Sequence, residues 1–562
     1  MAFQISPGVN VSEVDLTTVV PSVLTTAGAF AGQFRWGPAN QVKLIDSEIT
    51  LTKTFGTPDA NSGVSFFTAA NFLSYGNNLS VVRAIDASSK NSDSNTSTVN
   101  ILVENDEIFQ STYLSTDNHD LHGPFIGRFP GSVGNGIEIS VCDNPTDFAL
   151  WEYKGYFQSA PGTSAHASES GGGYDEMHII VIDTTGNFGP VNAVLETYAF
   201  VSKAFDATVN GESNYYKQVI FNKSKYIHSM GPVDYANTHT TWDRDSRTTF
   251  TRLSGIKEYV LNGGVTQAVS DGDLETAYDL FSNKETIDIS LVLTGDASAT
   301  VQNYVISSIS AGRADCVAFV SPPKSAVINN AGNETTDIES WLSALNTVSS
   351  YAVADSGWKY QYDKYNNIYR WIPLNGDVAG LCVYTDTTRD PWFSPAGFNR
   401  GQIKNCIKLA WNPSKTYRDT LYAAGVNPVV SFPGQGTVLF GDKTLLNKPN
   451  AFDRINVRRL FIVLEKAIAR AAQSSLFELN DEFTRAQFIS LITPFLRDVQ
   501  GRRGITDFKV VCDTTNNTPQ VIDSNRFVGD IYIKPARSIN FIQLNFVAVG
   551  TGVDFATIVG AV

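Results

Sequence analysis

Two apolar runs with a helical segment between them constrain the fold of this chain more than any other feature. Residues 288–294 read DISLVLT, and residues 315–321 read DCVAFVS and are followed by two prolines. Short, continuous apolar runs of this kind are typical of strands covered on both faces. Residues 299–311 are predicted to form a helix, and a strand–helix–strand unit joins parallel strands. The chain therefore contains an α/β domain with a covered sheet.

This α/β body is predicted to span residues 21–86 and 285–420. A helix is expected over Asp337–Ala352, with apolar side chains on one face: Ile338, Trp341, Leu342, Leu345 and Val348. Residues 358–371 read WKYQYDKYNNIYRW and are predicted to form a hairpin with aromatic cross-strand pairs. Stacking of these rings on a sugar or a base is the alternative interpretation.

Residues 87–284 separate the two parts of the body and differ from them in composition. They hold 12 Lys/Arg against 25 Asp/Glu, a net charge of −13, and are rich in Ser, Asn, Thr and Gly. We interpret them as an acidic, β-rich surface insertion of one or two subdomains. All six histidines lie here: His119, His122, His166, His178, His228 and His239. His119 and His122 could share a metal, but no third or fourth ligand lies at useful spacing. Surface histidines are therefore expected, and no metal site is predicted.

Residues 421–539 are predicted to form a C-terminal inner domain. Residues 400–470 hold 12 Lys/Arg against 4 Asp/Glu, a net charge of +8. A helix is expected over Asp453–Gln473, and on a helical wheel its apolar side chains share one side. Three cations lie on the opposite side and are expected to form an outward basic stripe: Arg459, Lys466 and Arg470. A second helix is expected to start near Asn480, to kink at Pro494 and to stop at Gly501.

Both ends of the chain are predicted to be arms, residues 1–20 and 540–562. Each contains a strand without a hairpin partner next to it, and a lone strand needs an existing sheet edge. Donation of these strands to neighbouring copies is one interpretation, and pairing inside their own domain is the other. The apolar positions of the two strands are Val9, Val11 and Val14, and Ile542, Leu544 and Phe546. The fold class is thus α/β and α+β multidomain, with mixed-sheet core domains, a β-rich surface insertion and extended terminal arms.

No enzymatic motif is found. Gly436 and Gly441 have the separation of a P-loop, but Asp442 stands between Gly441 and Lys443 and places a carboxylate where a phosphate would bind. No nucleophile elbow, zinc-protease motif or dinucleotide fingerprint is present. We therefore predict no catalytic residue and no cofactor.

Charge and hydropathy exclude further classes. The net charge of −14 argues against nucleic-acid binding. No apolar run reaches about 18 residues, so no membrane insertion is expected. The N-terminus lacks the features of a signal peptide, which favours synthesis in the cytoplasm. Five scattered cysteines are expected to be buried thiols: Cys142, Cys316, Cys382, Cys406 and Cys512.

Several long, non-periodic strings resemble the tail sheath proteins of contractile-tailed, myovirus-type bacteriophages. They are Ser6-Pro-Gly-Val-Asn-Val-Ser-Glu, Phe129-Pro-Gly-Ser-Val-Gly-Asn, Tyr369-Arg-Trp-Ile-Pro-Leu, Asp390-Pro-Trp-Phe-Ser-Pro-Ala-Gly-Phe-Asn-Arg-Gly, Phe440-Gly-Asp-Lys-Thr and Ile455-Asn-Val-Arg-Arg-Leu. The resemblance covers residues 1–86 and 350–562 and is thin across the insertion.

The resemblance implies a structural subunit that is not an enzyme. It would polymerise with itself as stacked hexameric rings around a tail tube, and contract to drive the tube through the host envelope. Its implied partners are the tail tube protein, the baseplate and the tail terminator, and its place is the virion tail, after synthesis in the host cytoplasm. The terminal strands would join sheets of neighbouring subunits, and the basic stripe would face the tube.

Three alternatives stay open at this point. The first is a non-contractile virion surface or baseplate component with a carbohydrate-binding insertion. The second is an enzyme whose site carries no known motif. The third is a bacterial contractile injection device, which would share the sheath fold.

Overall fold

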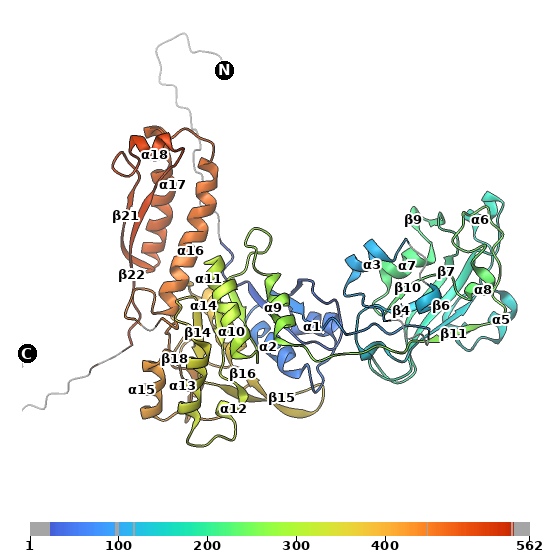
Figure 1. The fold of residues 1–562 in the computed structure, drawn as a ribbon, viewed down its shortest axis with the longest axis horizontal. Helices are drawn as coiled ribbons and strands as arrows, with labels where there is room; N and C mark the ends of the chain where they lie inside the picture. Colours follow the sequence, from blue (N-terminus) through green and yellow to red (C-terminus); the bar gives the residue numbers. More distant parts are fainter. Residues whose placement is uncertain (1–22, 96–99, 116–118, 447, 541–542, 544–562) are drawn as a thin grey trace, which may run out of the picture. The chain divides into compact units, whose positions relative to one another are not determined.

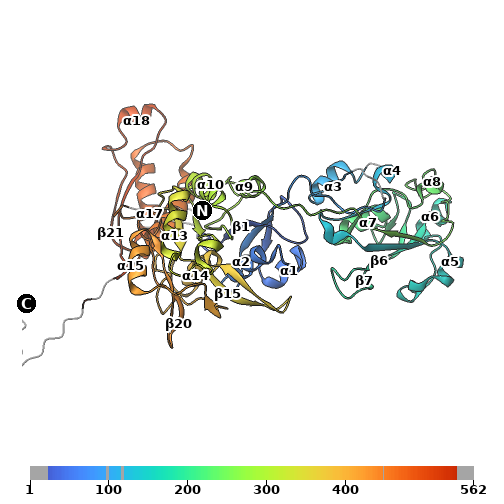
Figure 2. The same cartoon turned by 60° about the horizontal axis from the view of Figure 1, so that its bottom comes forward.

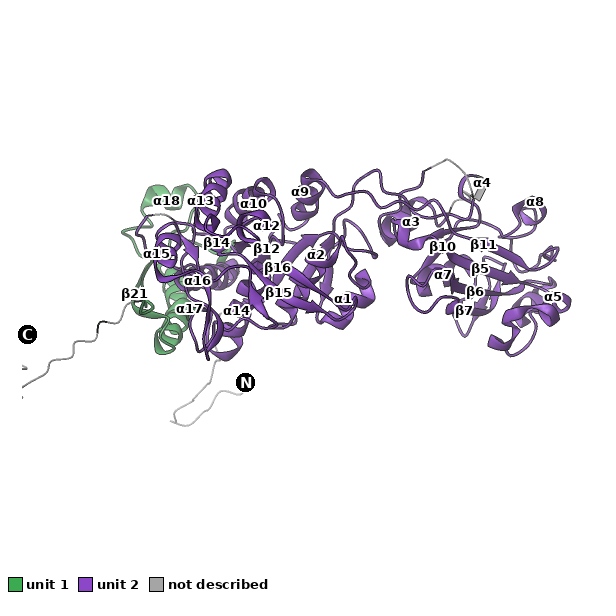
Figure 3. Ribbon diagram, turned by 90° about the horizontal axis from the view of Figure 1, so that it is seen from below, with its two compact units in different colours: residues 1–19, 392–394, 475–562 green, residues 20–391, 395–474 purple. Residues whose placement is uncertain are grey.

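The computed structural model describes residues 23–95, 100–115, 119–446, 448–540 and 543 (Figure 1). The six apolar positions of the predicted terminal strands lie outside these residues. The described chain forms two compact units (Figure 3). The larger runs up to Pro391 and resumes over Pro395–Ser474, and the smaller holds Trp392–Ser394 and the residues from Ser475 onward.

A seven-stranded mixed sheet forms the centre of the larger unit, with the order β18-β14-β13-β12-β1-β3-β2. Its neighbouring strands are parallel except for the antiparallel pair β2–β3. The strands are β1 (Gly28–Gly32), β2 (Lys43–Ile45), β3 (Leu79–Arg83), β12 (Leu291–Leu293), β13 (Val317–Val320), β14 (Ala352–Asp355) and β18 (Val426–Asn427). The predicted strand–helix–strand unit is confirmed, because β12 and β13 pair in parallel.

Helices cover both faces of this sheet, with a hydrophobic core on each face. Successive side chains along a strand enter the two cores in turn. Leu291 and Leu293 enter one core, while Val292 between them enters the other. The first core is covered by α1 (Glu48–Phe55), α2 (Gly63–Leu73), α14 (Asn375–Thr388) and α16 (Ile455–Ala472). The second is covered by α9 (Asp271–Asp279), α10 (Ala299–Tyr304), a π-helical segment (Val305–Ser310), α12 (Lys324–Val327), α13 (Glu334–Leu345) and α15 (Lys415–Ala423). The short α11 (Ala311–Arg313) follows the π-helical segment.

Helix α13 differs from its predicted span at both ends. It begins at Glu334 and ends at Leu345, where Asn346 takes a left-handed conformation (φ 46°) that terminates a helix. Ala352, the predicted last residue, instead begins β14. The predicted apolar face holds for Ile338, Trp341 and Leu345, which are buried, but Val348 lies beyond the helix and is 64% exposed.

The aromatic hairpin is confirmed. Strands β15 (Trp358–Asp363) and β16 (Ile368–Pro373) are antiparallel, with Tyr360 opposite Trp371 and Tyr362 opposite Tyr369. The two pairs of rings lie 4.6 and 5.3 Å apart, between centroids. Strand β17 (Lys408–Leu409) adds to the other side of β15, and a second hairpin joins β19 (Val429–Phe432) to β20 (Gly436–Leu439).

The predicted insertion contains an antiparallel four-stranded sheet, β11-β5-β6-β7, with a hydrophobic core of its own. These strands are β5 (Ile137–Cys142), β6 (Glu176–Asp183), β7 (Ala193–Ser202) and β11 (Lys257–Val260). Around them lie β4 (Phe125–Gly127), β8 (Thr208–Val209), β9 (Glu212–Ser213), β10 (Ile227–Ser229), α3 (Asp106–Thr112), α4 (His119–His122), α5 (Pro145–Leu150), α6 (Ala165–Ser170), α7 (Tyr216–Lys223) and α8 (Tyr235–Thr238). Its predicted boundary at residue 284 is too late, because Ala277 and Tyr278 of α9 pack in the body core.

The expectation of surface histidines is wrong for three of the six. His122, His178 and His228 are buried. The His228 ring stacks on Phe109 at 3.8 Å between centroids, and the His178 ring stacks on Phe157 at 4.3 Å. A neutral imidazole packs as an aromatic ring, and this use leaves no signal in the spacing of histidines along the sequence. Within the described ranges, no cluster of three or more His, Cys, Asp or Glu side chains is placed to hold a metal ion.

The C-terminal domain boundary also differs from the prediction. The larger unit extends to Ser474 rather than to residue 420, because β18 joins the edge of the central sheet and α16 packs in the body core. The smaller unit consists of α17 (Glu482–Gly501), α18 (Pro519–Asp523), β21 (Ile505–Val511) and β22 (Asp530–Pro535). Helix α17 starts after Asp481, whose side chain accepts from the Thr484 amide, and runs through Pro494 to the expected end at Gly501.

Candidate functional site

Helix α16 carries the three cations of the predicted basic stripe, and each is paired inside the larger unit. Arg459 is only 4% exposed and makes a two-pronged ion pair with Asp386 of α14, at 2.7 and 2.5 Å. Burial alone would lower the pKa of Arg459, but the Asp386 carboxylate raises it above its usual range. The Lys466 amine lies 2.9 Å from an Asp288 carboxylate oxygen, and Arg470 pairs with the other oxygen of Asp288.

The outward stripe is therefore wrong for Arg459 and Lys466. A helical wheel shows which side chains share a face, but not which carboxylates from distant segments cover that face. Only Arg470 keeps a substantially exposed side chain, at 40%. Contact between α16 and a tube stays a prediction, and among these three cations only Arg470 is exposed enough to carry it.

The charged residues of the glycine-rich segment that resembles a P-loop are paired with other parts of the larger unit. The Asp442 carboxylate is buried and lies 3.0 Å from the Arg454 guanidinium, and the Lys443 amine donates to the Tyr422 carbonyl at 2.6 Å. The Asp442 carbonyl also accepts from the Ile455 amide at 2.8 Å. These contacts hold the first turn of α16 in place. The charged groups of this segment are therefore used in contacts within the fold rather than in binding a phosphate.

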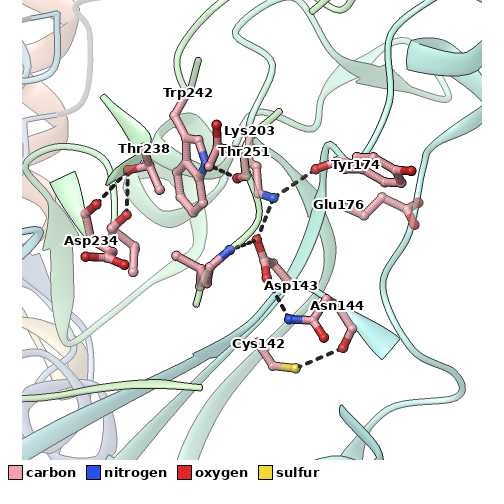
Figure 4. Close-up of polar contacts among 12 residues, drawn as sticks. Cys142, Asp143, Asn144, Tyr174, Glu176, Lys203, Asp234, Thr238, Trp242 and Thr251 are labelled. Carbon is pink, nitrogen blue, oxygen red and sulfur yellow. Dashed lines mark hydrogen bonds and ion pairs between the residues drawn. The ribbon is translucent and has the colours of Figure 1, made fainter. Parts of the chain in front are cut away.

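The insertion contains a buried ion pair that no pattern in the sequence predicts (Figure 4). The Lys203 amine lies 2.8 Å from an Asp143 carboxylate oxygen and donates to the Tyr174 carbonyl, also at 2.8 Å. The Leu253 amide donates to the same Asp143 oxygen, and the Trp242 ring lies 4.9 Å from the Lys203 amine. Burial lowers the pKa of Lys203. Both side chains are fully buried and satisfied, so the pair ties strands together and offers no access to a substrate.

The smaller unit presents a sheet with only two described strands. Strand β21 pairs antiparallel with β22, and among the described residues no third strand joins either of them. Phe508 and Val510 of β21 are half-buried, while Lys509 between them is exposed. A two-stranded ribbon with backbone groups on its outer edges is a template for strand addition.

Comparison with known proteins gives the family. The family described as phage tail sheath protein central domain matches residues 268–445, and the phage tail sheath C-terminal domain matches residues 447–548. The tail sheath protein of Vibrio phage KVP40 is 35% identical, and the match covers 99% of this chain and 100% of the relative. That of Enterobacteria phage T4 is 33% identical and covers 99% of both chains.

Solved structures show the same fold at low identity. The sheath tail protein of Listeria innocua is 12% identical, with a TM-score of 0.52 over 91% of this chain and 94% of that chain. The helical sheath of the anti-feeding prophage in its contracted state is 13% identical, with a TM-score of 0.52 over 97% of this chain and 99% of that chain.

These full-length matches define a structural component of a virion tail. The chain belongs to the phage tail sheath family and is a contractile sheath subunit. The family assignment favours the sheath over the alternative of a non-contractile surface component. Among the helices of the described ranges, none is long and apolar enough to cross a membrane.

Proposed function

We propose that this subunit polymerises as stacked hexameric rings around a rigid tail tube, and that contraction of the rings drives the tube through the host envelope. The observation that carries this proposal is the match to tail sheath proteins over 99% of the chain. The tail tube protein, the baseplate and the tail terminator are the proposed partners.

The joints between subunits are proposed to be strands added to the ribbon of β21 and β22. The arms at residues 1–20 and 540–562 would supply these strands to neighbouring copies. Each backbone hydrogen bond adds only about 0.5–1.5 kcal/mol, but a strand of five or six residues makes several of them. Such joints would keep copies attached while the compact units move as rigid bodies.

Contraction then needs no chemical fuel in this proposal. A helical assembly stored in an extended arrangement releases free energy when its subunits move to a second arrangement with better contacts, which is the behaviour of a bistable assembly. The acidic insertion is proposed to lie on the outer surface, where its net negative charge is solvated.

Deletion of either arm tests the joints. A chain without residues 1–15 and a chain without residues 540–562 should each fold but stay monomeric, because the ribbon of the next copy receives no strand. Sedimentation measures the assembly, and circular dichroism with thermal unfolding controls for the fold. Full-length tubes from either shortened chain would contradict the proposed joints.

A further inference from the structure

Four large apolar side chains are exposed together between α16 and the first turn of α17. They form what we call the apolar tip: Leu476, Phe477, Leu479 and Phe483, which are 63%, 104%, 77% and 76% exposed. Phe477 also has a left-handed backbone (φ 70°), a conformation that bulky residues rarely adopt. Three exposed carboxylates accompany the tip, Glu478, Asp481 and Glu482. Exposed apolar side chains in such a group are typical of an interaction surface.

A second exposed apolar group lies in the larger unit, beside the start of α16. We call it the phenylalanine cluster: Phe398, Phe432 and Phe440, whose ring centroids lie 5.3–6.1 Å from one another. Phe398 and Phe440 are each more than 40% exposed. The Arg418 guanidinium of α15 lies 5.7 Å from the Phe432 ring and 5.8 Å from the Phe440 ring, and Lys415 is exposed on the same helix.

The two groups are complementary. The apolar tip carries carboxylates, and the phenylalanine cluster carries Arg418 and Lys415, against the single exposed carboxylate of Asp419 on α15. Aromatic side chains with an arginine over them are the composition found at the centre of protein interfaces, and opposite charges at the edge fix the register.

The length of the covalent chain keeps Leu476, at the start of the tip, away from the first turn of α16. The cluster lies at the first turn of α16, where the Ile455 amide bonds Asp442, two residues after Phe440. The tip follows the last turn, and the 18 residues of α16 span about 27 Å. Leu476 lies four residues past Ala472, a reach of at most about 14 Å, so it cannot return to the first turn of its own helix.

We propose that the apolar tip of one sheath subunit docks on the phenylalanine cluster of a neighbouring subunit. The contact joins two different surfaces, so it is head-to-tail and repeats from copy to copy. This inference rests on the proposed self-assembly, and it adds a contact distinct from the donated strands.

Charge reversal with mixing tests the contact. One variant carries Glu478→Lys and Glu482→Lys, and the other carries Lys415→Glu and Arg418→Glu. In each variant alone, the net charges of the tip and of the cluster have the same sign and repel. The concentration needed for half-maximal assembly should therefore rise by about tenfold or more. In a 1:1 mixture every contact between unlike copies again joins opposite charges, so assembly should return. Glu339→Lys on the exposed surface of α13 is the matched control and should assemble like the parent.

Cross-linking tests the same contact independently of tube formation. Phe477→Cys and Phe398→Cys chains, purified separately and mixed under oxidising conditions, should give a covalent dimer that the unmixed chains do not give. Phe477→Cys mixed with Leu150→Cys, an 81% exposed position in the insertion, is the control. The linked peptide is identified by mass spectrometry, in sedimented assemblies and in concentrated solution.

The possible outcomes distinguish a failure of this contact from a failure of the proposed sheath function. Tubes that form normally from both charge variants, or a mixture that does not recover, overturn the contact and leave the sheath function intact. A specific cross-link in a chain that forms no tubes supports the contact and counts against the sheath function. Assembly that requires Phe477 but gives no cross-link to Phe398 assigns the tip to another partner and overturns the pairing.

Discussion

Among the described residues of the larger unit, two Lys–Asp pairs are fully buried, one in the insertion and one in the body. Lys203 pairs with Asp143 in the insertion, and Lys359 pairs with Asp377 in the body, both at 2.8 Å. Removing a charge from water costs several kcal/mol, so the second charge and the surrounding hydrogen bonds must offset that cost. Losing one partner then leaves the other charged and buried.

The Lys203→Met variant should therefore be strongly destabilised. We expect a loss of about 3–5 kcal/mol in the free energy of unfolding, measured by chemical denaturation. Adding Asp143→Leu should recover part of the loss, because the unpaired carboxylate is then removed as well. Lys223→Met, at an exposed position, is the control. An equal loss from the control would show that the pair is not the cause.

His228 makes stability depend on pH. Burial lowers its pKa to about 4 from an ordinary 6.5. In the unfolded chain this histidine is therefore protonated below pH 6.5, whereas in the folded chain it stays neutral down to about pH 4. The stabilisation is complete above pH 6.5 and should fall by about 1.4 kcal/mol per pH unit as the pH drops toward 4.

The His228→Phe variant tests this dependence, because phenylalanine keeps the stack on Phe109. Amide hydrogen exchange of β10 at pH 7 and pH 5 should show a smaller change in the variant than in the parent. Asp106 and Arg128 also face this ring and stay in both chains. Equal changes in both chains would contradict the assignment to His228.

At the scale of elements, the sequence predicts what depends on local periodicity. The continuous apolar runs predict the parallel strands β12 and β13, and Tyr-Asn-Asn within an aromatic run predicts the hairpin of β15 and β16. The sequence alone could not show that the basic face of α16 is covered. Its partners are distant in sequence: Asp386 lies 73 residues from Arg459, and Asp288 lies 178 residues from Lys466. The same holds for the exposed tip, since only the structure shows that nearby apolar residues fail to reach a core.

Arg459 and Arg470 on α16 should respond differently to charge reversal. Arg459→Glu places a carboxylate against the buried Asp386 and should cost about 3–5 kcal/mol of stability. Arg470→Glu acts on a largely solvated side chain and should cost less than about 1 kcal/mol. Thermal unfolding measures both. Similar losses of stability in the two variants would contradict the prediction that Arg459 is buried and Arg470 is solvated.

Arg470→Glu also tests whether α16 contacts the tube. If the helix faces the tube, the variant should assemble with itself but bind tubes less well at low salt, because an exposed ion pair is screened by salt. Cosedimentation with purified tubes measures binding. Unchanged binding would remove the last of the three predicted cations from the tube contact.

At the scale of the whole molecule, composition separates the acidic insertion from the body, but it does not place the boundaries. Helix α9 has an acidic, polar exposed face that resembles the insertion in composition, although its buried face belongs to the body core. The helix α16 belongs to the body by its packing, while its sequence neighbours from Ser475 onward belong to the smaller unit. Boundaries of this kind depend on contacts between distant segments, which a change in composition does not report.

The most direct test of the sheath assignment is electron microscopy of the purified full-length chain, with and without tail tubes. The account predicts stacked rings that coat the tubes, or hollow helical cylinders wider than a tube when the chain assembles alone. A chain that stays monomeric under both conditions, at concentrations well above those of the other tail components, would contradict it.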